Sequence, residues 1–284
     1  MIILILGMLL TGASWVIAWS PISLFSEYSF FPLWLGYILT VNGLSETLYS
    51  DSIMKRMRFN FPTLFAASIP FWWFFELINQ IVQNWEYVFP HPISETRFIV
   101  QASISFSTVL PAVLSTIFLV YRLLSRLDYP WRCRPIGGRQ RWLALSVSSG
   151  VICLFLLGLV PKVTFALVWI APILIMEPVV FALRCSSLLG KIKNGDWLLP
   201  VSVMTATVVC GFFWEMWNVH SSPKWIYTVP YVGFLKIFEM PLLGYFGYPF
   251  FGVVVYSYTT FIFCGLLRRY SVNELICTTR PQLP

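Results

Sequence analysis

Charged residues are scarce in this chain. Asp, Glu, Lys and Arg make up 11% of its 284 residues, whereas a soluble domain carries about 25%. Apolar runs of about 18 or more residues recur along the whole sequence, and runs of that length are typical of helices that span a bilayer. The composition therefore excludes a soluble enzyme, a disordered chain and a disulfide scaffold, and it predicts an all-α, polytopic membrane protein.

Histidines are few, and several common catalytic motifs are missing. His91 and His220 are the 2 histidines, so a bis-His haem or a His-rich metal site is not expected. The sequence contains no Walker A motif, no H-E-x-x-H, no G-x-S-x-G, no C-x-x-C and no D-x-x-x-D pair that would hold magnesium for a prenyl diphosphate. These absences count against phosphate-dependent and zinc-dependent chemistry, and we expect neither a metal nor a cofactor.

The 6 cysteines do not indicate a disulfide framework. Cys153, Cys210 and Cys264 lie within apolar runs, where a thiol packs as a small hydrophobic group. We therefore expect no disulfide and no thiol chemistry.

The apolar runs predict eight transmembrane helices of about 18 to 24 residues. They lie near residues 2–19, 30–48, 61–82, 98–121, 142–160, 164–183, 198–218 and 247–267. The first run lacks a basic start and an A-x-A cleavage site, so we expect it to be a span and not a signal peptide.

The basic residues test this count of spans. With a cytoplasmic N-terminus, all of the 19 Lys and Arg residues except Arg97, Lys162, Lys224 and Lys236 fall on the cytoplasmic side. Because Lys and Arg favour cytoplasmic loops, this distribution supports eight spans with both termini inside. It also explains the net charge of +7 without a nucleic-acid partner. The expected location is the bacterial cytoplasmic (inner) membrane, and a homo- or hetero-oligomer there is left open.

One motif occurs twice in the chain. The pattern F-x-E-x-x-N-x(5,6)-W-x-Y fits residues 74–87 and again residues 213–227. The sequence is therefore expected to form two four-helix halves, 1–141 and 142–284. Since four is an even number, both halves would insert the same way up, as a parallel repeat about an axis along the membrane normal.

The second half contains a long apolar segment, residues 221–249, with prolines at 230, 241 and 249. Interior prolines make a continuous helix costly, by about 3 kcal/mol or more each. We expect this segment to be an external re-entrant or interfacial lid. Residues 229–248 are predicted to fold over the outer ends of the third and seventh spans, covering Glu76 and Glu215.

The motif places two pairs of polar residues inside spans. Glu76 and Asn79, like Glu215 and Asn218, are three residues apart and share a helix face. An ionisable residue in a span costs about 2.5–3.5 kcal/mol on insertion scales, so it usually faces the protein interior. Two carboxyl groups in a partly dry site favour keeping one protonated, as a general acid. The same pairs would also serve as helix-to-helix hydrogen bonds or as an ion or proton path.

Several other residues are candidates for a functional role, and each also has an ordinary structural explanation. Glu239, next to Pro241 in the lid, is a candidate catalytic carboxyl or a surface residue. Glu177 aligns with Asn42 by a shared W-x(7) spacing, and the ordinary explanation for it is helix packing. The aromatic side chains of the motif are candidates for lining a substrate pocket or for an interfacial belt, and His220 is a candidate proton carrier or a solvated residue. The aromatic candidates are Trp85, Tyr87, Trp225 and Tyr227.

The stretch W-E-M-W-N, K-W-I-Y-T-V-P and F-E-M-P-L-L-G-Y-F-G-Y-P-F-F, residues 214–251, resembles uncharacterised bacterial polytopic membrane proteins. More loosely, Glu residues on duplicated helix sets resemble integral-membrane terpene and carotenoid cyclases or hydratases. That resemblance implies protonation of an olefin or epoxide by an intramembrane carboxylic acid, with aromatic walls that guide a carbocation. The P-x-E-E type motif of the lycopene cyclase domain is absent here.

The leading hypothesis is an integral-membrane protein that handles a long apolar lipid, with an isoprenoid as the expected class. Glu76, Glu215 and Glu239 are the acid candidates, and Asn79 and Asn218 are expected to orient the first two. The alternative is a non-enzymatic membrane-complex subunit, or a small-solute or ion transporter, that uses the same residues structurally or as a path.

Overall fold

A computed structural model describes residues 1–20, 25–135 and 142–277. It is mostly helical, at 72%. The helices of the first half are α1 (Ile2–Ala18), α2 (Phe30–Tyr49), α3 (Ile53–Met57), α4 (Pro62–Val82), α5 (Glu95–Phe106) and α6 (Val109–Leu124). Those of the second half are α7 (Trp142–Leu159), α8 (Pro161–Thr164), α9 (Leu167–Ala182), α10 (Leu188–Lys193), α11 (Leu198–Asn218), α12 (Gly247–Thr260) and α13 (Val272–Cys277). The strands are β1 (Trp85–Val88), β2 (Lys224–Tyr227), β3 (Lys236–Ile237) and β4 (Met240–Pro241).

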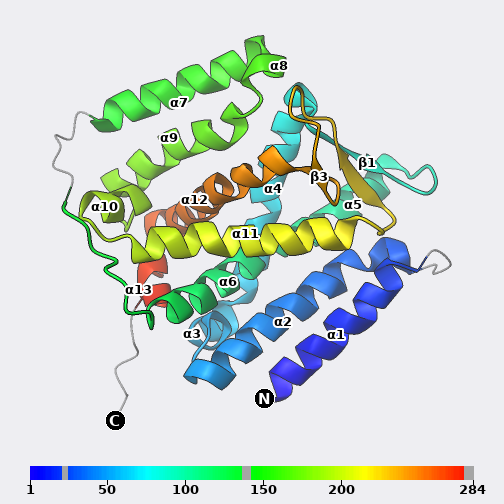
Figure 1. Cartoon of the computed structure of the whole chain (residues 1–284), viewed down its shortest axis with the longest axis horizontal. Helices are drawn as coiled ribbons and strands as arrows, with labels where there is room; N and C mark the ends of the chain where they lie inside the picture. Colours follow the sequence, from blue (N-terminus) through cyan, green and yellow to red (C-terminus); the bar gives the residue numbers. More distant parts are fainter. Residues whose placement is uncertain (21–24, 136–141, 278–284) are drawn as a thin grey trace.

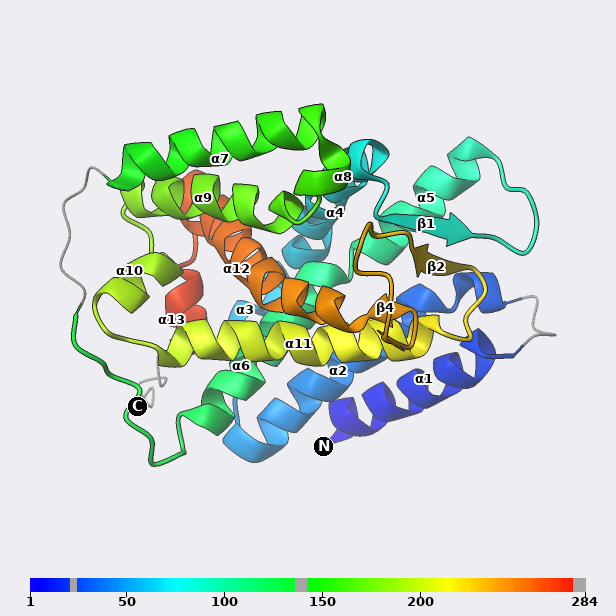
Figure 2. The same cartoon turned by 45° about the horizontal axis from the view of Figure 1, so that its top comes forward.

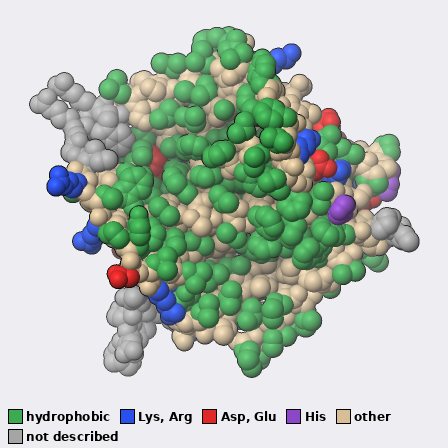
Figure 3. Space-filling model, viewed as in Figure 1, with side chains coloured by type: hydrophobic (Ala, Val, Ile, Leu, Met, Phe, Trp, Pro, Cys, Tyr) green, Lys and Arg blue, Asp and Glu red, His purple; other side chains and the backbone are tan. Residues whose placement is uncertain are grey.

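Helices lie on all eight ranges that the apolar runs predict. Four are long and apolar enough to cross a membrane: residues 62–82, 95–124, 198–218 and 242–266. The helices Ile2–Ala18, Leu143–Leu159 and Leu167–Ala182 are apolar but shorter. The space-filling view has a broad hydrophobic surface, with most charged side chains near its two ends (Figure 3). Such a surface suits an integral membrane protein.

The helices form two hairpins at opposite edges of the molecule. The α1–α2 pair lies at one edge and the α7–α9 pair at the other, with α6, α11 and α12 between them (Figures 1 and 2). One end of the molecule carries β1 and β2, and we call it the strand end. The opposite end carries α3, α10 and α13, and we call it the arginine end because Arg56 and Arg122 lie there.

Glycines set the close approach of α1 to α2. A Cβ atom on Gly43 would lie 2.5 Å from the Leu4 backbone nitrogen, and one on Gly7 would lie 2.5 Å from the Thr40 nitrogen. In a membrane, where the hydrophobic effect does not drive helices together, small residues allow this backbone-to-backbone packing. The α1–α2 hairpin is therefore specified by glycines spaced along its seam.

The predicted fourth span is broken. It consists of α5 and α6, which are separated at Ser107 and Thr108. Pro111 has no backbone N–H, so the helical ladder cannot continue through it. Ser68 of α4 repairs the break, because its Oγ donates to the Phe106 carbonyl at 2.5 Å and accepts the Leu110 N–H at 3.1 Å. Irregular backbone at membrane depth requires such partners from the protein.

Matching contacts occur in the two halves near the arginine end. Asn42 Oδ1 accepts the Met54 N–H, 12 residues later, at 3.0 Å, and Glu177 Oε2 accepts the Leu189 N–H, also 12 residues later, at 2.8 Å. Asn42 Nδ2 donates to Ser115 Oγ of α6, whereas Glu177 Oε1 accepts from Ser257 Oγ of α12. Both side chains are therefore used to hold a short helix and a later long helix. The predicted boundary of the halves, at residue 141, lies outside the described residues, as do Arg139, Arg141 and Arg280.

The arginine end contains a buried ion-pair network. The Asp51 carboxylate accepts two hydrogen bonds from Arg56, at 2.6 and 2.9 Å, and Arg122 Nη2 lies 3.7 Å from the same oxygen. Arg56 Nη1 also donates to the carbonyls of Glu274 and Leu275. The network thereby links α13 to α3 and to the end of α6.

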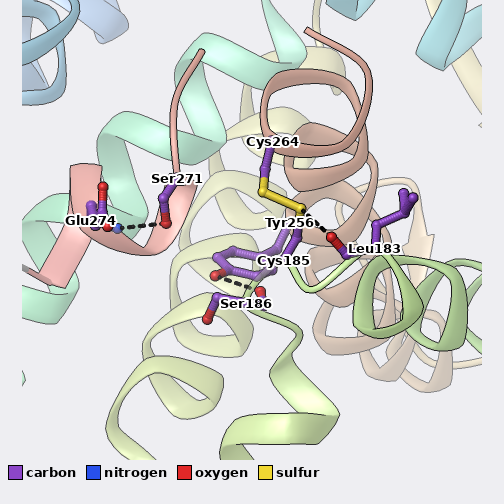
Figure 4. Close-up of a disulfide and its surroundings, with 7 residues drawn as sticks. All are labelled: Leu183, Cys185, Ser186, Tyr256, Cys264, Ser271 and Glu274. Atoms are coloured by element: carbon purple, nitrogen blue, oxygen red, sulfur yellow. Dashed lines mark hydrogen bonds between the residues drawn. A yellow bond between two sulfur atoms is a disulfide. The ribbon is translucent and has the colours of Figure 1, made fainter. Parts of the chain in front are cut away.

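A disulfide joins Cys185 and Cys264, so the expectation of no disulfide was wrong. Their Cα atoms are 6.1 Å apart and their sequence positions differ by 79. Figure 4 shows the bond between the turn after α9 and the π-helical segment Phe261–Leu266 that follows α12. Nothing in the spacing of the cysteines signals this pairing, because it depends on the packing of α9 against α12.

The structure also contains two small β-sheets, which the all-α prediction did not include. Strands β1 and β2 form one two-stranded sheet, and β3 and β4 form another. Residues 229–248, predicted as the lid, contain the β3–β4 hairpin and then a 3₁₀ helix, Leu242–Phe246, in place of a continuous helix. The apolar run that ends in α12 begins within this segment, at Leu242.

Candidate functional site

The two copies of the motif meet at the strand end. Each copy consists of the end of a long helix, α4 or α11, followed by a short strand, β1 or β2. The strands pair antiparallel, so that Trp85 is opposite Tyr227 and Tyr87 is opposite Trp225. Each tryptophan of one copy thus faces the tyrosine of the other. This register has local two-fold symmetry, centred on the middle residue of each W-x-Y.

The asparagine of each copy anchors its own strand. Asn218 Nδ2 donates to the Trp225 carbonyl at 2.7 Å, and Asn218 Oδ1 accepts the Trp225 N–H at 2.9 Å. Asn79 makes the same two bonds with Trp85, at 2.8 and 3.3 Å, and it also accepts the Asn84 N–H. The side-chain amides of Asn79 and Asn218, which were predicted to orient the glutamates, therefore bind the backbone of β1 and β2.

The glutamate of each copy accepts a hydrogen bond from the tyrosine of its own strand. Tyr87 OH donates to Glu76 Oε1 at 2.6 Å, and Tyr227 OH donates to Glu215 Oε1 at 2.7 Å. The spacing of the motif is thereby explained, because the Glu and Asn on one helix face reach the Tyr hydroxyl and the Trp backbone of the strand that follows.

The two glutamates differ in their remaining donors. Glu76 Oε1 also accepts from the indole nitrogens of Trp72, at 2.8 Å, and of Trp85, at 3.2 Å. In the second copy, Gly211 occupies the position of Trp72, four residues before the glutamate. The ring of Tyr248 from α12 lies over Gly211, and its hydroxyl donates to Glu215 Oε1 at 2.7 Å. In the second copy, Tyr248 of α12 therefore supplies a hydrogen bond like the one that Trp72 supplies from the glutamate's own helix in the first copy.

A cavity of about 450 Å³ opens between the two copies. Its volume is in the range of small-molecule sites, about 300–1,000 Å³. Motif residues in its wall are Trp85, Tyr87, Glu215, Asn218, Trp225 and Tyr227, and other large wall residues are Phe30, Trp72, Phe98, Phe106, Trp169, Trp214, Trp217, Tyr248 and Phe251. Eight residues of the predicted lid, 229–248, also line the cavity: Val229, Val232, Met240, Leu243, Gly244, Phe246, Gly247 and Tyr248.

Part of the cavity wall is an aromatic cluster around Phe251. The rings of Trp72, Trp169 and Trp214 meet the Phe251 ring edge-on, with centroids 5.9, 5.6 and 6.0 Å away. Aromatic walls of this kind bind apolar chains, and their faces also stabilise a positive charge by about 0.5–2 kcal/mol each.

The two motif glutamates differ in their position relative to the cavity. Glu215 is fully buried, and its Oε2 has no hydrogen-bond partner in the described part of the chain. Glu76 is not among the residues that line the cavity, and neither is Asn79. Glu215 is therefore a residue of the cavity wall with one buried carboxyl oxygen unpartnered, whereas Glu76 lies outside the wall and its Oε1 accepts from three donors.

The strand tyrosines remain hydrogen-bond donors over the physiological pH range. Burial, followed by the charge of the neighbouring glutamate, raises the pKa of Tyr87 and of Tyr227 well above their ordinary value of 10.0. Both hydroxyls therefore stay protonated and donate hydrogen bonds to Glu76 and Glu215.

The remaining predicted residues lie outside the cavity wall. Glu239 pairs with Lys224, whose Nζ is 2.5 Å from Glu239 Oε1. The His220 ring packs edge-on against Trp19, with centroids 5.0 Å apart. Glu177 is buried near the arginine end. Among the described residues, no group of three or more His, Cys, Asp or Glu could hold a metal ion.

Sequence reasoning missed several residues of the cavity, most clearly Tyr248, Gln101 and Asn84. Tyr248 lies within the apolar segment that the sequence singles out, but its contact with Glu215 depends on how α12 packs against α11. One signal was available, since Gly211 interrupts the match between the two copies where Trp72 stands in the first.

No family model, curated protein or solved structure matches this chain. The site therefore has to be interpreted from its own geometry and chemistry.

Proposed function

We propose that the protein binds a long apolar lipid, with an isoprenoid as the expected class, and that Glu215 acts on it as a general acid. The observation that carries this proposal is the unpartnered Oε2 of Glu215 in the wall of an aromatic cavity. The lining is largely apolar and aromatic, which suits a hydrocarbon chain better than a polar solute.

The chemistry needs no cofactor. The protonated carboxyl of Glu215 would give its proton to a carbon of a double bond, which leaves a carbocation on the lipid. Nearby aromatic faces, such as those of Trp214 and Phe251, stabilise that cation. After an internal double bond closes a ring on the cation, loss of a proton to the Glu215 carboxylate ends the reaction. Atoms and charge balance, because the proton that leaves the enzyme returns to it.

Replacing Glu215 tests this proposal. The Glu215→Gln variant keeps an oxygen that accepts from Tyr227 and Tyr248 but cannot donate the same proton. We expect the protein to stay folded and its lipid product to fall by about 10²-fold or more. The measurement is mass spectrometry of lipids extracted after overexpression, with thermal stability in detergent. Glu95→Gln, at an exposed position outside the cavity, is the matched control.

An unchanged lipid profile together with unchanged stability in Glu215→Gln would reject the acid role. The non-enzymatic alternative, a complex subunit or transporter, would then be preferred, since the motif's Asn79 and Asn218 already hold structure. A loss of equal size in Glu76→Gln would extend the acid role to the first copy.

We further propose that eight helices span the membrane in two parallel four-helix repeats, with both termini in the cytoplasm. The recurring contacts of Asn42 and Glu177, the paired strands and the excess of basic residues at the arginine end support this arrangement. It places the cavity toward the outside and makes residues 229–248 its lid. Cysteine labelling of intact cells tests it, because positions near Lys55 and Arg134 must be inaccessible from outside.

A further inference from the structure

The part of the cavity wall that reaches the molecular surface is apolar. Among the lining residues that the structure describes, the exposed ones are Ala166, Leu243, Phe246 and Phe250, and the others are buried or half-buried. Leu243, Phe246 and Phe250 are 47%, 68% and 45% exposed. A wall residue that is also exposed marks a place where the wall is either open or one side chain thick.

These four residues belong to two neighbouring segments. Ala166 lies in the turn between α8 and α9, and the other three lie where the predicted lid leads into α12. Helix α12 lies between α9 and α11 and packs against both (Figure 1). The two segments meet at Gly247, where a Cβ atom would lie 3.1 Å from Trp169 Nε1. The exposed wall is therefore one strip between the start of α9 and the start of α12, and we call it the side opening.

The side opening borders helices that suit contact with lipid. Leu243, Phe246 and Phe250 fall within residues 242–266, a segment long and apolar enough to cross a membrane. Ala166 directly precedes the apolar helix Leu167–Ala182. The exposed wall therefore continues into hydrocarbon-compatible helix surface and not into a polar loop.

The charged residues of the wall lie away from the exposed strip. Among the described lining residues, Glu27, Lys224 and Glu215 are the Asp, Glu, Lys or Arg residues, and none of them is exposed. Glu27 is paired with Arg97, and Lys224 is paired with Glu239. A polar solute arriving from water would thus meet apolar side chains at the side opening, whereas an apolar chain arriving from the bilayer would pass them without entering water.

We propose that the ligand enters the cavity sideways from the bilayer, through the side opening and past Phe246 and Phe250. This inference rests on the proposed function in taking the ligand to be a lipid. It adds the source of that lipid, which is the half of the bilayer that borders the strand end. Within the wall, the Trp169 and Phe251 rings have centroids 5.6 Å apart, so an entering chain reaches the aromatic cluster directly.

Thiol labelling of a buried wall position tests this route. Val109 of α6 lines the cavity and is 4% exposed, so Val109→Cys places a thiol in the buried wall. The whole protein, with its four free cysteines replaced by Ser, is placed in bilayer nanodiscs, where water reaches both faces. One maleimide reagent has a long apolar tail that partitions into the bilayer, and the other has a sulfonate that keeps it in water. We expect the apolar maleimide to label Val109→Cys and the sulfonated one to fail.

Variants at the surface locate the opening. Ala166→Trp should slow labelling by the apolar maleimide about tenfold, since a tenfold change in rate needs about 1.4 kcal/mol of added barrier, which one overpacked contact supplies. Phe246→Ala should speed labelling. Leu9→Trp, at an exposed apolar position of α1 outside the cavity wall, is the matched control and should leave the rate unchanged. Val203→Cys, which is buried outside the wall, should react with neither reagent.

A second reporter covers the case in which Val109→Cys does not fold. Ala102→Cys, on α5, also lines the cavity and is 9% exposed. Failure of the apolar maleimide to label either folded reporter, while both thiols react in unfolded protein, would overturn the inference. Equal labelling by the two reagents would overturn it in favour of entry from water.

The remaining outcomes concern the place of entry and the proposed function. Labelling that neither Ala166→Trp nor Phe246→Ala changes would overturn the assignment of the side opening. The labelling measures no lipid product, so its failure would leave the acid role of Glu215 standing. An unchanged lipid profile in Glu215→Gln would, conversely, leave the side opening in place.

Discussion

Gly211 should be intolerant of even one added methyl group, because the Tyr248 ring occupies the space beside it. A Cβ atom at position 211 would lie 2.5 Å from three atoms of that ring, whereas ordinary contacts are about 3.5–4.0 Å. The ring must therefore move, and its hydroxyl then leaves Glu215 Oε1, which it now reaches at 2.7 Å.

Two opposing effects set the magnitude. Replacing Gly by Ala within a helix gains about 0.5–1 kcal/mol from backbone entropy. Overpacking costs about 1–3 kcal/mol, and the lost hydrogen bond costs about another 0.5–1.5 kcal/mol. We expect Gly211→Ala to lower the free energy of unfolding by about 0.5–4 kcal/mol, and to impair any activity that depends on Glu215.

Gly12 provides the control of opposite sign. No atom lies within 4 Å of a Cβ built there, so Gly12→Ala should stabilise the protein by about 0.5–1 kcal/mol. Thermal unfolding in detergent measures both variants. In a Tyr248→Ala background, where the ring is gone, Gly211→Ala should become neutral or stabilising, as a double-mutant cycle would reveal. Equal stabilisation by Gly211→Ala and Gly12→Ala in the wild-type background would refute the reasoning.

Three further perturbations probe the strand anchor, the disulfide and the strand tyrosines. Asn218→Ala should cost about 2–4 kcal/mol in detergent unfolding because it leaves two half-buried backbone groups of Trp225 in β2 without their partner; a loss no larger than that of the exposed Asn194→Ala would contradict this. Cys185→Ser should cost about 2–5 kcal/mol, as removal of a native disulfide does, whereas Cys133→Ser, at an exposed free cysteine, should have no effect, and equal melting of both variants would count against the bond. Because the pKa of Tyr227 is raised above 10.0, its contribution is fully present below about pH 10 and is lost above it as the unfolded chain ionises. Stability measured against pH should therefore fall less steeply above pH 10 in Tyr227→Phe, and an identical slope would show that this tyrosine is not coupled to folding.

Much of the site followed from residue pattern alone, because its parts are local. Glu215 and Asn218 are three residues apart on one helix, and the strand that they bind starts a few residues later. Within such a short stretch, helix geometry and chain connectivity limit where the side chains can reach. The recurrence of the motif also indicated that both copies play a related part. What was not foreseen is that each Asn binds strand backbone, since an amide within an apolar run gives no hint of its partner.

The sequence by itself determined the membrane-compatible composition, the positions of the helices and the paired motif, since these depend on residue type and on spacing along one helix. Tertiary structure decided which of the two motif glutamates lines the cavity. Glu76 and Glu215 stand in nearly the same local pattern, yet one is covered by Trp72 and the other borders the cavity beneath Tyr248. That difference arises from the packing of α12 against α11, as the disulfide of Cys185 arises from the packing of α12 against α9. Contacts between residues far apart in sequence depend on the shapes of whole helix surfaces, and no local pattern of residues encodes them.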